Sequence, residues 1–195
     1  MTLRVANSGD LADIMRLERR SFPDDAWSEQ TMADELAGAH GVYLVDVEAD
    51  RVVGYGGVRA LPGGSDADIQ TIALDADFRG RGRGRALLQA LIAQALARGA
   101  RELFLEVRAD NPVARSLYDS EGFEELGRRP RYYQPADVDA VVMRLDLRAW
   151  AASRGTQGTE GEVRRADAGA PPADRAELGQ SSAPDGSGAA EETIA

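Results

Sequence analysis

One segment constrains the fold of this chain most. It is a short apolar run, followed by a glycine- and arginine-rich turn and then by a helical pattern. Residues 69–74 read IQTIAL, a composition that favours a strand. Residues 79–85 alternate arginine with glycine, and apolar side chains then recur at helical spacing from Leu87 to Leu96. A strand that turns through glycines into a helix leaves the N–H groups of the first helical turn free, so this segment predicts an anion-binding site.

The residues of this turn favour a phosphate ligand, because arginine offers forked donors that match phosphate. The dinucleotide motif G-x-G-x-x-G does not fit, since a count from Gly80 or from Gly82 reaches no third glycine. The P-loop does not fit either, since it needs a lysine and all 23 basic side chains here are arginine. An arginine-rich surface loop and a nucleic-acid patch remain as alternatives to a small phosphorylated ligand.

Composition predicts a cytoplasmic protein without a metal. The 195 residues are 43% hydrophobic, which is enough for a core. No apolar run approaches the length of a membrane span, and the N-terminus has no signal pattern. The absence of cysteine excludes disulfides, thiolate metal sites and a cysteine nucleophile, and a lone His40 cannot form a histidine-rich metal site. We expect no membrane partner and a monomer.

The net charge of −10 argues against general nucleic-acid binding and favours a cationic partner. An acidic surface that keeps the protein in solution is the simpler explanation of this charge. Against this background the arginine-rich turn is a local positive region. It suits a small phosphorylated cofactor better than a polyanion.

The patterns predict an α/β (α+β) fold with a mixed central sheet of about seven strands and about four flanking helices. Expected helices pass through Leu11–Leu17, Met32–Leu36 and Leu87–Leu96, and a fourth lies between Asn111 and Gly122. The expected strands cover residues 3–5, 42–47, 51–59, 68–74, 102–107, 124–127 and 140–147.

The character of the sequence changes at about residue 150. Residues 151–195 are rich in alanine, glycine, serine, proline and acids, and their large aliphatic side chains are Val163, Leu178 and Ile194. Such a segment cannot bury enough apolar surface to offset the entropy of ordering. We therefore expect a folded domain over residues 1–149 and a disordered acidic tail over 150–195.

Five stretches in order resemble the GCN5-related N-acetyltransferase (GNAT) superfamily, in its ribosomal-protein-alanine N-acetyltransferase branch. Arg79-x-x-Gly82-x-Gly84 resembles the loop that holds the pyrophosphate of acetyl-CoA. The other four stretches are 105–111 (LEVRADN), 114–123 (Ala-x-x-Leu-Tyr-x-x-x-Gly-Phe), 129–133 (Arg-x-Arg-Tyr-Tyr) and 139–143 (DAVVM). The resemblance covers roughly residues 2–147 and implies the GNAT fold.

The resemblance also implies where acetyl-CoA binds. The backbone of Ile72, Ala73 and Leu74 is expected to bond the pantetheine and acetyl end of the cosubstrate, and one of these N–H groups to hold the oxyanion. Asn111 is expected to touch the same molecule. The residues expected to wrap the pyrophosphate are Gly80, Arg81, Gly82, Arg83, Gly84 and Arg85.

Two residues resemble the family's catalytic pair. Glu106 corresponds to a general base that takes a proton from the attacking amine, and Tyr118 to a general acid that protonates the leaving CoA thiolate. The alternatives are an exposed strand carboxylate for Glu106 and helix packing for Tyr118. Without a cysteine, direct transfer in a ternary complex is favoured over an acetyl-enzyme.

The acceptor implied by the resemblance is a protein N-terminus, namely the N-terminal alanine of a ribosomal protein. Trp27, Tyr132 and Tyr133 are the candidates for gripping this peptide, with ordinary packing as the alternative. The acidic domain would favour basic residues after the alanine. Three other functions stay open: acetylation of a small amine such as a polyamine or aminoglycoside, acetylation of a protein lysine, and a non-catalytic acyl-CoA-binding module.

Overall fold

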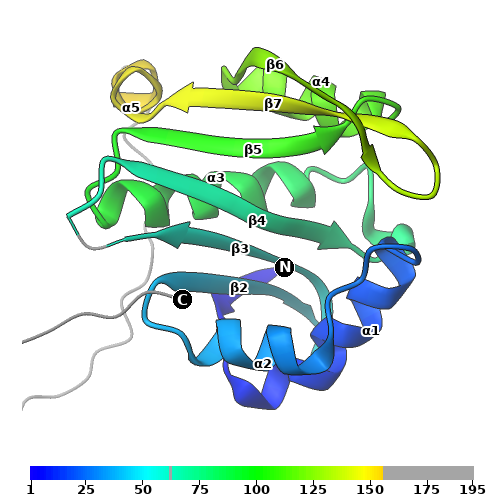
Figure 1. Cartoon of the computed structure of the whole chain (residues 1–195). Coiled ribbons are helices and arrows are strands. Elements are labelled where there is room, and N and C mark those ends of the chain that lie inside the picture. Colours follow the sequence, from blue (N-terminus) through cyan, green and yellow to red (C-terminus); the bar gives the residue numbers. More distant parts are fainter. Residues whose placement is uncertain (62, 156–195) are drawn as a thin grey trace, which may run out of the picture. The chain divides into compact units, whose positions relative to one another are not determined.

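The computed structural model describes residues 1–61 and 63–155, which form a seven-stranded sheet with helices on both faces (Figure 1). The strand order is β1-β2-β3-β4-β5-β7-β6. All neighbours are antiparallel except β4 and β5, which are parallel. The strands are β1 (Thr2–Val5), β2 (Gly41–Glu48), β3 (Arg51–Ala60), β4 (Asp66–Leu74), β5 (Glu102–Arg108), β6 (Glu124–Tyr133) and β7 (Val138–Asp146).

Two hydrophobic cores lie on opposite faces of this sheet. One joins α3 and α4 to the sheet, and the other joins α1 and α2 to it (Figure 1). None of the helices in the described ranges is long and apolar enough to cross a membrane. The helices are α1 (Leu11–Ser21), α2 (Glu29–Ala37), α3 (Arg83–Ala97), α4 (Pro112–Glu121) and α5 (Leu147–Gly155), with short 3-10 turns η1 (Ser8–Asp10) and η2 (Ala76–Phe78).

The two parallel strands at the centre of the sheet separate after a short contact. Residues 66–68 of β4 pair with residues 102–104 of β5, and beyond Asp68 the ladder between them stops. From there β4 stays with β3 as far as Leu74, while β5 stays with β7 as far as Arg108. The sheet therefore opens between β4 and β5, and backbone groups of β4 that face β5 are left outside the ladder.

The mixed α/β sheet of seven strands is confirmed, with two differences in detail. β6 continues to Tyr133, although residues 128–133 were expected to form a connection. This edge strand is exposed along most of its length, so it lacks the apolar alternation that marks a strand in a sequence.

The second difference is a fifth helix, α5, which takes in residues 150–155 of the predicted tail. Asp146 starts it, because its Oδ1 accepts hydrogen bonds from the N–H groups of Arg148 and Ala149 at 2.9 Å each. Leu147 is buried, and Trp150 packs against the core on the α3 face. The rest of the predicted tail, residues 156–195, lies outside the described residues.

Candidate active site

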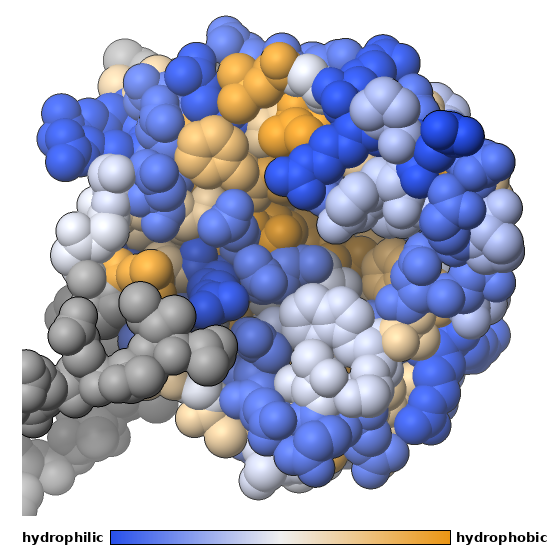
Figure 2. Space-filling view, in the orientation of Figure 1, coloured by the Kyte–Doolittle hydropathy of each residue, from blue (hydrophilic) through white to orange (hydrophobic). Residues whose placement is uncertain are grey.

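The opening between β4 and β5 is where most of the predicted site residues gather. The face of the molecule seen in Figure 2 is hollowed near its centre, with hydrophobic residues inside and hydrophilic residues around the rim. β5 and β7 border the opening on one side, and β4 and the turn that follows it border the other side. A ligand in this opening can reach both faces of the sheet.

The middle of β5 places Glu106 beside the opening. Leu105 and Val107 are buried in the core with α3 and α4, so by strand alternation Glu106 points to the opposite face. Its side chain is 28% exposed, and Oε1 pairs with Arg129 Nη1 at 2.8 Å. The charge of Glu106 is also the main reason why the pKa of Tyr132 is raised. A carboxylate that solvent can reach among such donors can accept a proton from an amine.

Tyr118 lies on α4, in the core on the other face of the sheet. Its ring contacts that of Phe123, with 5.7 Å between the ring centres. Burial raises the pKa of the Tyr118 hydroxyl to about 12, and the interaction with Tyr133 acts in the same direction. The hydroxyl is therefore protonated at neutral pH and can donate. Tyr133 interacts electrostatically with Glu106 as well, so one hairpin residue lies near both predicted catalytic side chains.

The turn after β4 requires its glycines for two different reasons. Gly80 and Gly82 have φ of 71° and 77°, and a Cβ on either would meet no atom within 4 Å. Their backbone conformation, not lack of space, requires glycine. At Gly84 a Cβ would lie 3.3 Å from Leu74 Cδ1, so glycine lets α3 start close to β4. Because the first helical hydrogen bond of α3 ends at the carbonyl of Gly82, the helix offers no acceptor to the N–H groups of residues 83–85.

Two arginines of the turn bind carboxylates of the fold with their side chains. Arg83 is 8% exposed; its Nε donates to Asp46 Oδ2 at 2.7 Å, and it also pairs with Glu48. Arg85 Nη1 donates to the buried carboxylate of Glu121 at 2.5 Å. These bonds attach the start of α3 to β2 and to α4. The buried Arg83 can consequently offer its backbone N–H to a phosphate, whereas Arg85 is paired with Glu121 but keeps a side chain that is 45% exposed.

The other two arginines of the turn stay at the surface. Arg79 Nε donates to the carbonyl of Leu74 at 3.1 Å, and the guanidinium carbon of Arg81 lies 5.9 Å from the ring centre of Phe78. Both arginines are exposed. A phosphate can therefore approach both of these side chains.

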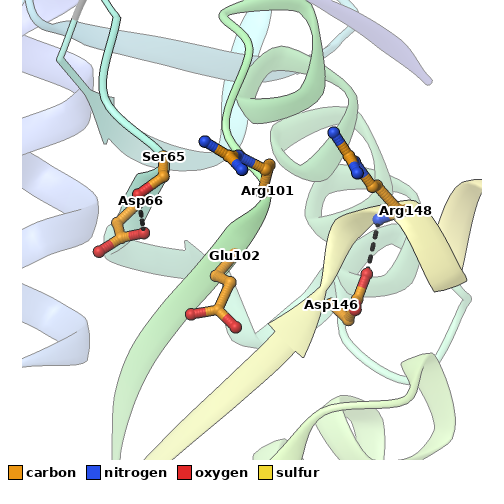
Figure 3. A pocket seen from close by; sticks show the side chains of 6 residues that line it. All are labelled: Ser65, Asp66, Arg101, Glu102, Asp146 and Arg148. Carbon is orange, nitrogen blue, oxygen red and sulfur yellow. Dashed lines mark hydrogen bonds between the residues drawn. The ribbon is translucent and has the colours of Figure 1, made fainter.

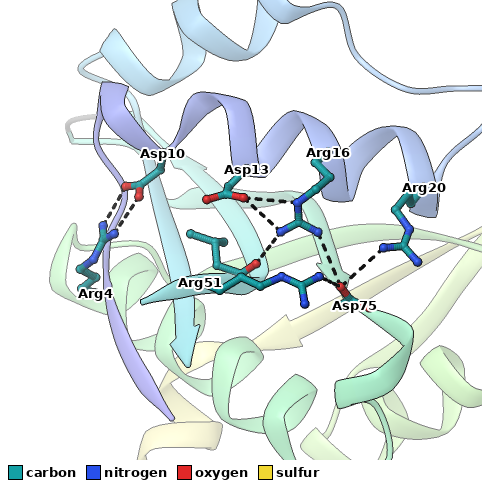
Figure 4. Close-up of polar contacts among 8 residues, drawn as sticks. Arg4, Asp10, Asp13, Arg16, Arg20, Arg51 and Asp75 are labelled. Atoms are coloured by element: carbon teal, nitrogen blue, oxygen red, sulfur yellow. Dashed lines mark hydrogen bonds and ion pairs between the residues drawn. The ribbon is translucent and has the colours of Figure 1, made fainter. Parts of the chain in front are cut away.

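A buried carboxylate fixes the point where β4 enters this turn. Asp75 is 4% exposed, and its Oδ2 lies 2.6 Å from Arg51 Nη2 (Figure 4). Nη1 of Arg16 and Nη1 of Arg20, both on α1, lie 3.6 and 3.7 Å from the same oxygen. Asp13 also pairs with Arg16, so three guanidinium groups face two carboxylates and leave one positive charge in excess beside the turn.

The remaining residues predicted to hold the cosubstrate lie on β4 and at the start of α4. Ile72 and Leu74 are half-buried and Ala73 is buried, all in the part of β4 that has left β5. Alternate residues of such a strand direct their N–H and C=O toward β3 or toward the opening. Asn111 is the N-cap of α4, and its Oδ1 accepts the N–H of Ala114 at 3.1 Å. The amide NH₂ of Asn111 is the part not used by the cap.

The side of the opening predicted to receive the acceptor is bordered by the hairpin of β6 and β7. Tyr132 is 49% exposed, and its ring meets that of Tyr133 edge to face, with 5.2 Å between the ring centres. The guanidinium carbon of Arg129 lies 5.6 Å from the ring centre of Tyr132, and that of Arg108 lies 5.1 Å from the ring centre of Tyr133. The structure thus brings both predicted acceptor tyrosines together with the carboxylate of Glu106.

Trp27 lies in the segment that connects α1 to α2, across from this hairpin. Asp25 of the same segment acts electrostatically on Arg108 and on Tyr133, which places the segment near the hairpin. The indole of Trp27 packs against the core between α1, α2 and the sheet. Its backbone N–H donates to Glu18 Oε1 at 3.0 Å.

A second, polar hollow of about 370 Å³ lies away from these residues, where β5 starts and β7 ends (Figure 3). Glu102, Arg101 and Asp146 are among the residues that line it. Glu102 and Glu106 are four residues apart on β5, which corresponds to roughly 13 Å along a strand. This hollow contains none of the residues predicted for catalysis or for cosubstrate binding.

Sequence reasoning did not assign roles to Arg129, Arg108 and Glu18. Arg129 belongs to the Arg-x-Arg-Tyr-Tyr stretch, but its carboxylate partner lies on another strand, and the pairing of β5 with β7 and of β7 with β6 brings them together. For Glu18 the sequence did offer a signal, because an acidic residue on the apolar face of a helix indicates a buried carboxylate.

Comparison with known proteins agrees with this geometry. The family model described as Acetyltransferase (GNAT) family matches residues 11–123. An uncharacterised protein of Mycobacterium leprae is 40% identical over 140 residues, which make up 70% of this chain but 38% of that protein. The N-alpha-acetyltransferase RimI of Mycobacterium tuberculosis is 36% identical over 149 residues, which cover 75% of this chain and 92% of that protein.

A solved structure is similar over the same region. The ribosomal-protein-S18-alanine N-acetyltransferase from Escherichia coli is 30% identical and aligns with a TM-score of 0.68. The alignment covers 84% of this chain and 98% of that one. With the opened sheet, the glycine turn before α3 and the matching family model, this chain belongs to the GNAT family of acetyltransferases.

Proposed function

We propose that the protein transfers the acetyl group of acetyl-CoA to the N-terminal α-amine of another protein, with the N-terminal alanine of a ribosomal protein as the preferred acceptor. The observation that carries the proposal is the position of Glu106. It lies beside the opening between β4 and β5, next to a hairpin with two tyrosines. The similarity to enzymes named for α-amino and alanine acetylation supports the same acceptor class.

The residues around the opening suit acetyl-CoA. The cosubstrate supplies an acetyl group activated as a thioester. Among Ile72, Ala73 and Leu74 on β4, the alternate residues whose backbone faces away from β3 can bond its extended arm, and an N–H facing the opening can stabilise the charge that develops on the carbonyl oxygen. The free N–H groups of residues 83–85 and the exposed Arg79 and Arg81 provide donors and charge for its phosphates.

Glu106 prepares the acceptor. An α-amine has a pKa of about 7.7–8.0, so at neutral pH most of it carries an extra proton that must leave before attack. The carboxylate of Glu106 can take this proton directly or through a water. The face on which Glu106 lies is the one that the α1–α2 segment and the hairpin border, so an amine can arrive there while the cosubstrate occupies the opening.

Tyr118 acts on the leaving group from the other face of the sheet. Its pKa of about 12 keeps the hydroxyl protonated, so it can donate a hydrogen bond to the sulfur as the carbon–sulfur bond breaks. A free thiol has a pKa near 8.5, so complete transfer of the Tyr118 proton to the thiolate is uphill. Hydrogen-bond donation is therefore the main contribution that this hydroxyl makes.

A peptide acetylation assay tests the proposal. Three acceptors are incubated with acetyl-CoA and enzyme: a peptide with a free N-terminal alanine followed by arginines and no lysine, the same peptide with serine first, and a peptide with a blocked N-terminus and one internal lysine. Mass spectrometry locates the acetyl group. We expect acetylation of the alanine peptide at its α-amine and slower acetylation of the serine peptide. Exclusive acetylation of the lysine peptide would overturn the proposal, and so would modification of a polyamine or aminoglycoside alone.

A further inference from the structure

Glu18 on α1 is a buried carboxylate that the chemistry proposed above does not use. The residue is 1% exposed, and no ion pair within residues 1–61 and 63–155 includes it. Burying a charged group without a cation is costly unless hydrogen bonds compensate. Oε1 of Glu18 accepts the backbone N–H of Trp27 at 3.0 Å, and Oε2 accepts the hydroxyl proton of Tyr55. These bonds use both oxygens of the carboxylate.

The bond from Tyr55 connects Glu18 with β4, the strand that borders the opening. Tyr55 on β3 is fully buried; burial and the charge of Glu18 raise its pKa, so the phenol keeps its proton. Its oxygen lies 3.3 Å from Thr71 Oγ1, which is long for a hydrogen bond between hydroxyl groups. Because the one phenol proton goes to Glu18, Thr71 is the donor in this contact. Thr71 precedes Ile72 in the part of β4 that no longer pairs with β5.

The first bond determines where the α1–α2 segment lies. Between Ser21 and Glu29 the chain has no helix or strand to hold it, and it carries Asp25 and Trp27. Asp25 interacts with the hairpin on the far side of the acceptor region. Glu18 therefore connects this segment, through Tyr55, to the strand on which the acetyl group is proposed to bind.

We propose that Glu18 is a positioning residue that holds the Trp27 segment as one wall of the acceptor site, at a fixed distance from β4. This inference rests on the proposed acceptor site. It predicts that breaking the bonds of Glu18 weakens binding of the acceptor peptide and leaves binding of acetyl-CoA unchanged, because the glycine turn and α3 do not contact Glu18 and β4 is held by its ladder with β3.

Steady-state kinetics of three variants test the role. Glu18→Met keeps the approximate volume and removes both acceptors; we expect the KM for the alanine peptide to rise about tenfold, with a smaller fall in kcat and an unchanged Kd for acetyl-CoA. Glu18→Gln keeps the network but reverses the direction of two hydrogen bonds. Its side-chain oxygen can accept from the N–H of Trp27, its NH₂ can donate to the Tyr55 hydroxyl, and Tyr55 can then donate to Thr71. We expect a KM near that of the wild type. Tyr43→Phe is the matched control, because it removes another tyrosine–carboxylate bond, from the buried Tyr43 to the half-buried Glu35 on α2.

A second readout does not depend on the acceptor. In a Trp150→Phe background Trp27 is the one tryptophan, and quenching of its fluorescence by acrylamide reports how well the segment is held. Glu18→Met should make Trp27 more accessible, and Glu18→Gln should not. If no peptide is acetylated but quenching changes in this way, the positioning role holds and the proposed acceptor is wrong. Unchanged quenching in Glu18→Met, or parallel changes in peptide KM and acetyl-CoA Kd, would overturn the role of Glu18.

Discussion

Glu106 and Glu102 form a natural comparison, because both lie on the same face of β5 and each pairs with one arginine. Their side chains are 28% and 38% exposed. Glu106→Gln keeps the shape and removes the base, so we expect kcat/KM for the peptide to fall about 10²–10⁴-fold. Glu102→Gln loses a comparable ion pair at the other end of the strand and should change kcat/KM less than threefold. Equal losses in the two variants would show that Glu106 acts through folding.

Tyr118 has a testable effect on the pH profile. Its pKa is raised to about 12, so the hydroxyl stays protonated throughout an assay between pH 6.5 and 9.5. Tyr118→Phe removes one hydrogen-bond donor to the leaving group and should therefore lower kcat by the same factor, roughly 10²-fold, at every pH in that range. Steady-state rates at half-unit intervals measure this, with a thermal melt to verify the fold. An alkaline fall that is present in the wild type and absent from Tyr118→Phe would contradict the assigned pKa.

At the scale of elements, the ends of helices could be predicted from local residue types, whereas the extent and register of an edge strand could not. Asn111 followed by Pro112 starts α4, and Gly122, with φ of 93°, ends it, as their residue types predict. β6 has no comparable signal, because its exposed edge position removes the apolar pattern. The register of β6 and β7 also shifts between Arg129 and Tyr133, and no local rule predicts such a shift.

The turn between β4 and α3 should depend on the backbone conformation of its glycines. Gly82→Ala places a Cβ at φ of 77°, which costs about 1–2 kcal/mol although no atom lies within 4 Å. We expect the Kd for acetyl-CoA to rise about tenfold while the fold is retained, as measured by calorimetric titration. Gly127→Ala is the control, since a Cβ there also meets no atom within 4 Å and Gly127 does not have a positive φ. An unchanged Kd in Gly82→Ala would mean that the turn does not hold the cosubstrate.

At the scale of the whole domain, the site is assembled from parts that the sequence keeps far apart. Glu106 meets Arg129 because β7 lies between their strands and pairs with both. Arg83 pairs with Asp46 across 37 residues. The GNAT resemblance predicted which residues approach the cosubstrate, but the turn arginines looked alike in the sequence. Which of them pairs with a carboxylate, as Arg83 and Arg85 do, depends on the acidic side chains that the fold brings near.

Acid should destabilise the domain, in part through Glu121. Burial raises the pKa of this carboxyl, but hydrogen bonds from Gln89, Arg85 and Trp150 and the charge of Arg154 outweigh burial and lower it below its usual 4.5. A carboxyl with a lowered folded pKa stabilises the fold above its unfolded pKa, and this contribution is lost as pH falls through the folded value. We therefore expect the urea midpoint to hold between pH 7 and 5 and to fall below about pH 4.5.

Glu121→Gln isolates the contribution of this one carboxylate to the loss of stability in acid. The variant should be less stable at pH 7, by at most roughly 3 kcal/mol because Arg85 and Arg154 remain nearly half exposed. It should then lose less stability than the wild type between pH 5 and 3, since it has no carboxylate to protonate at this position. Glu124→Gln, at a side chain that is 75% exposed, should follow the wild-type curve. Parallel curves for Glu121→Gln and the wild type would mean that other carboxylates, such as Asp10 with its bonded Arg4, account for the acid sensitivity.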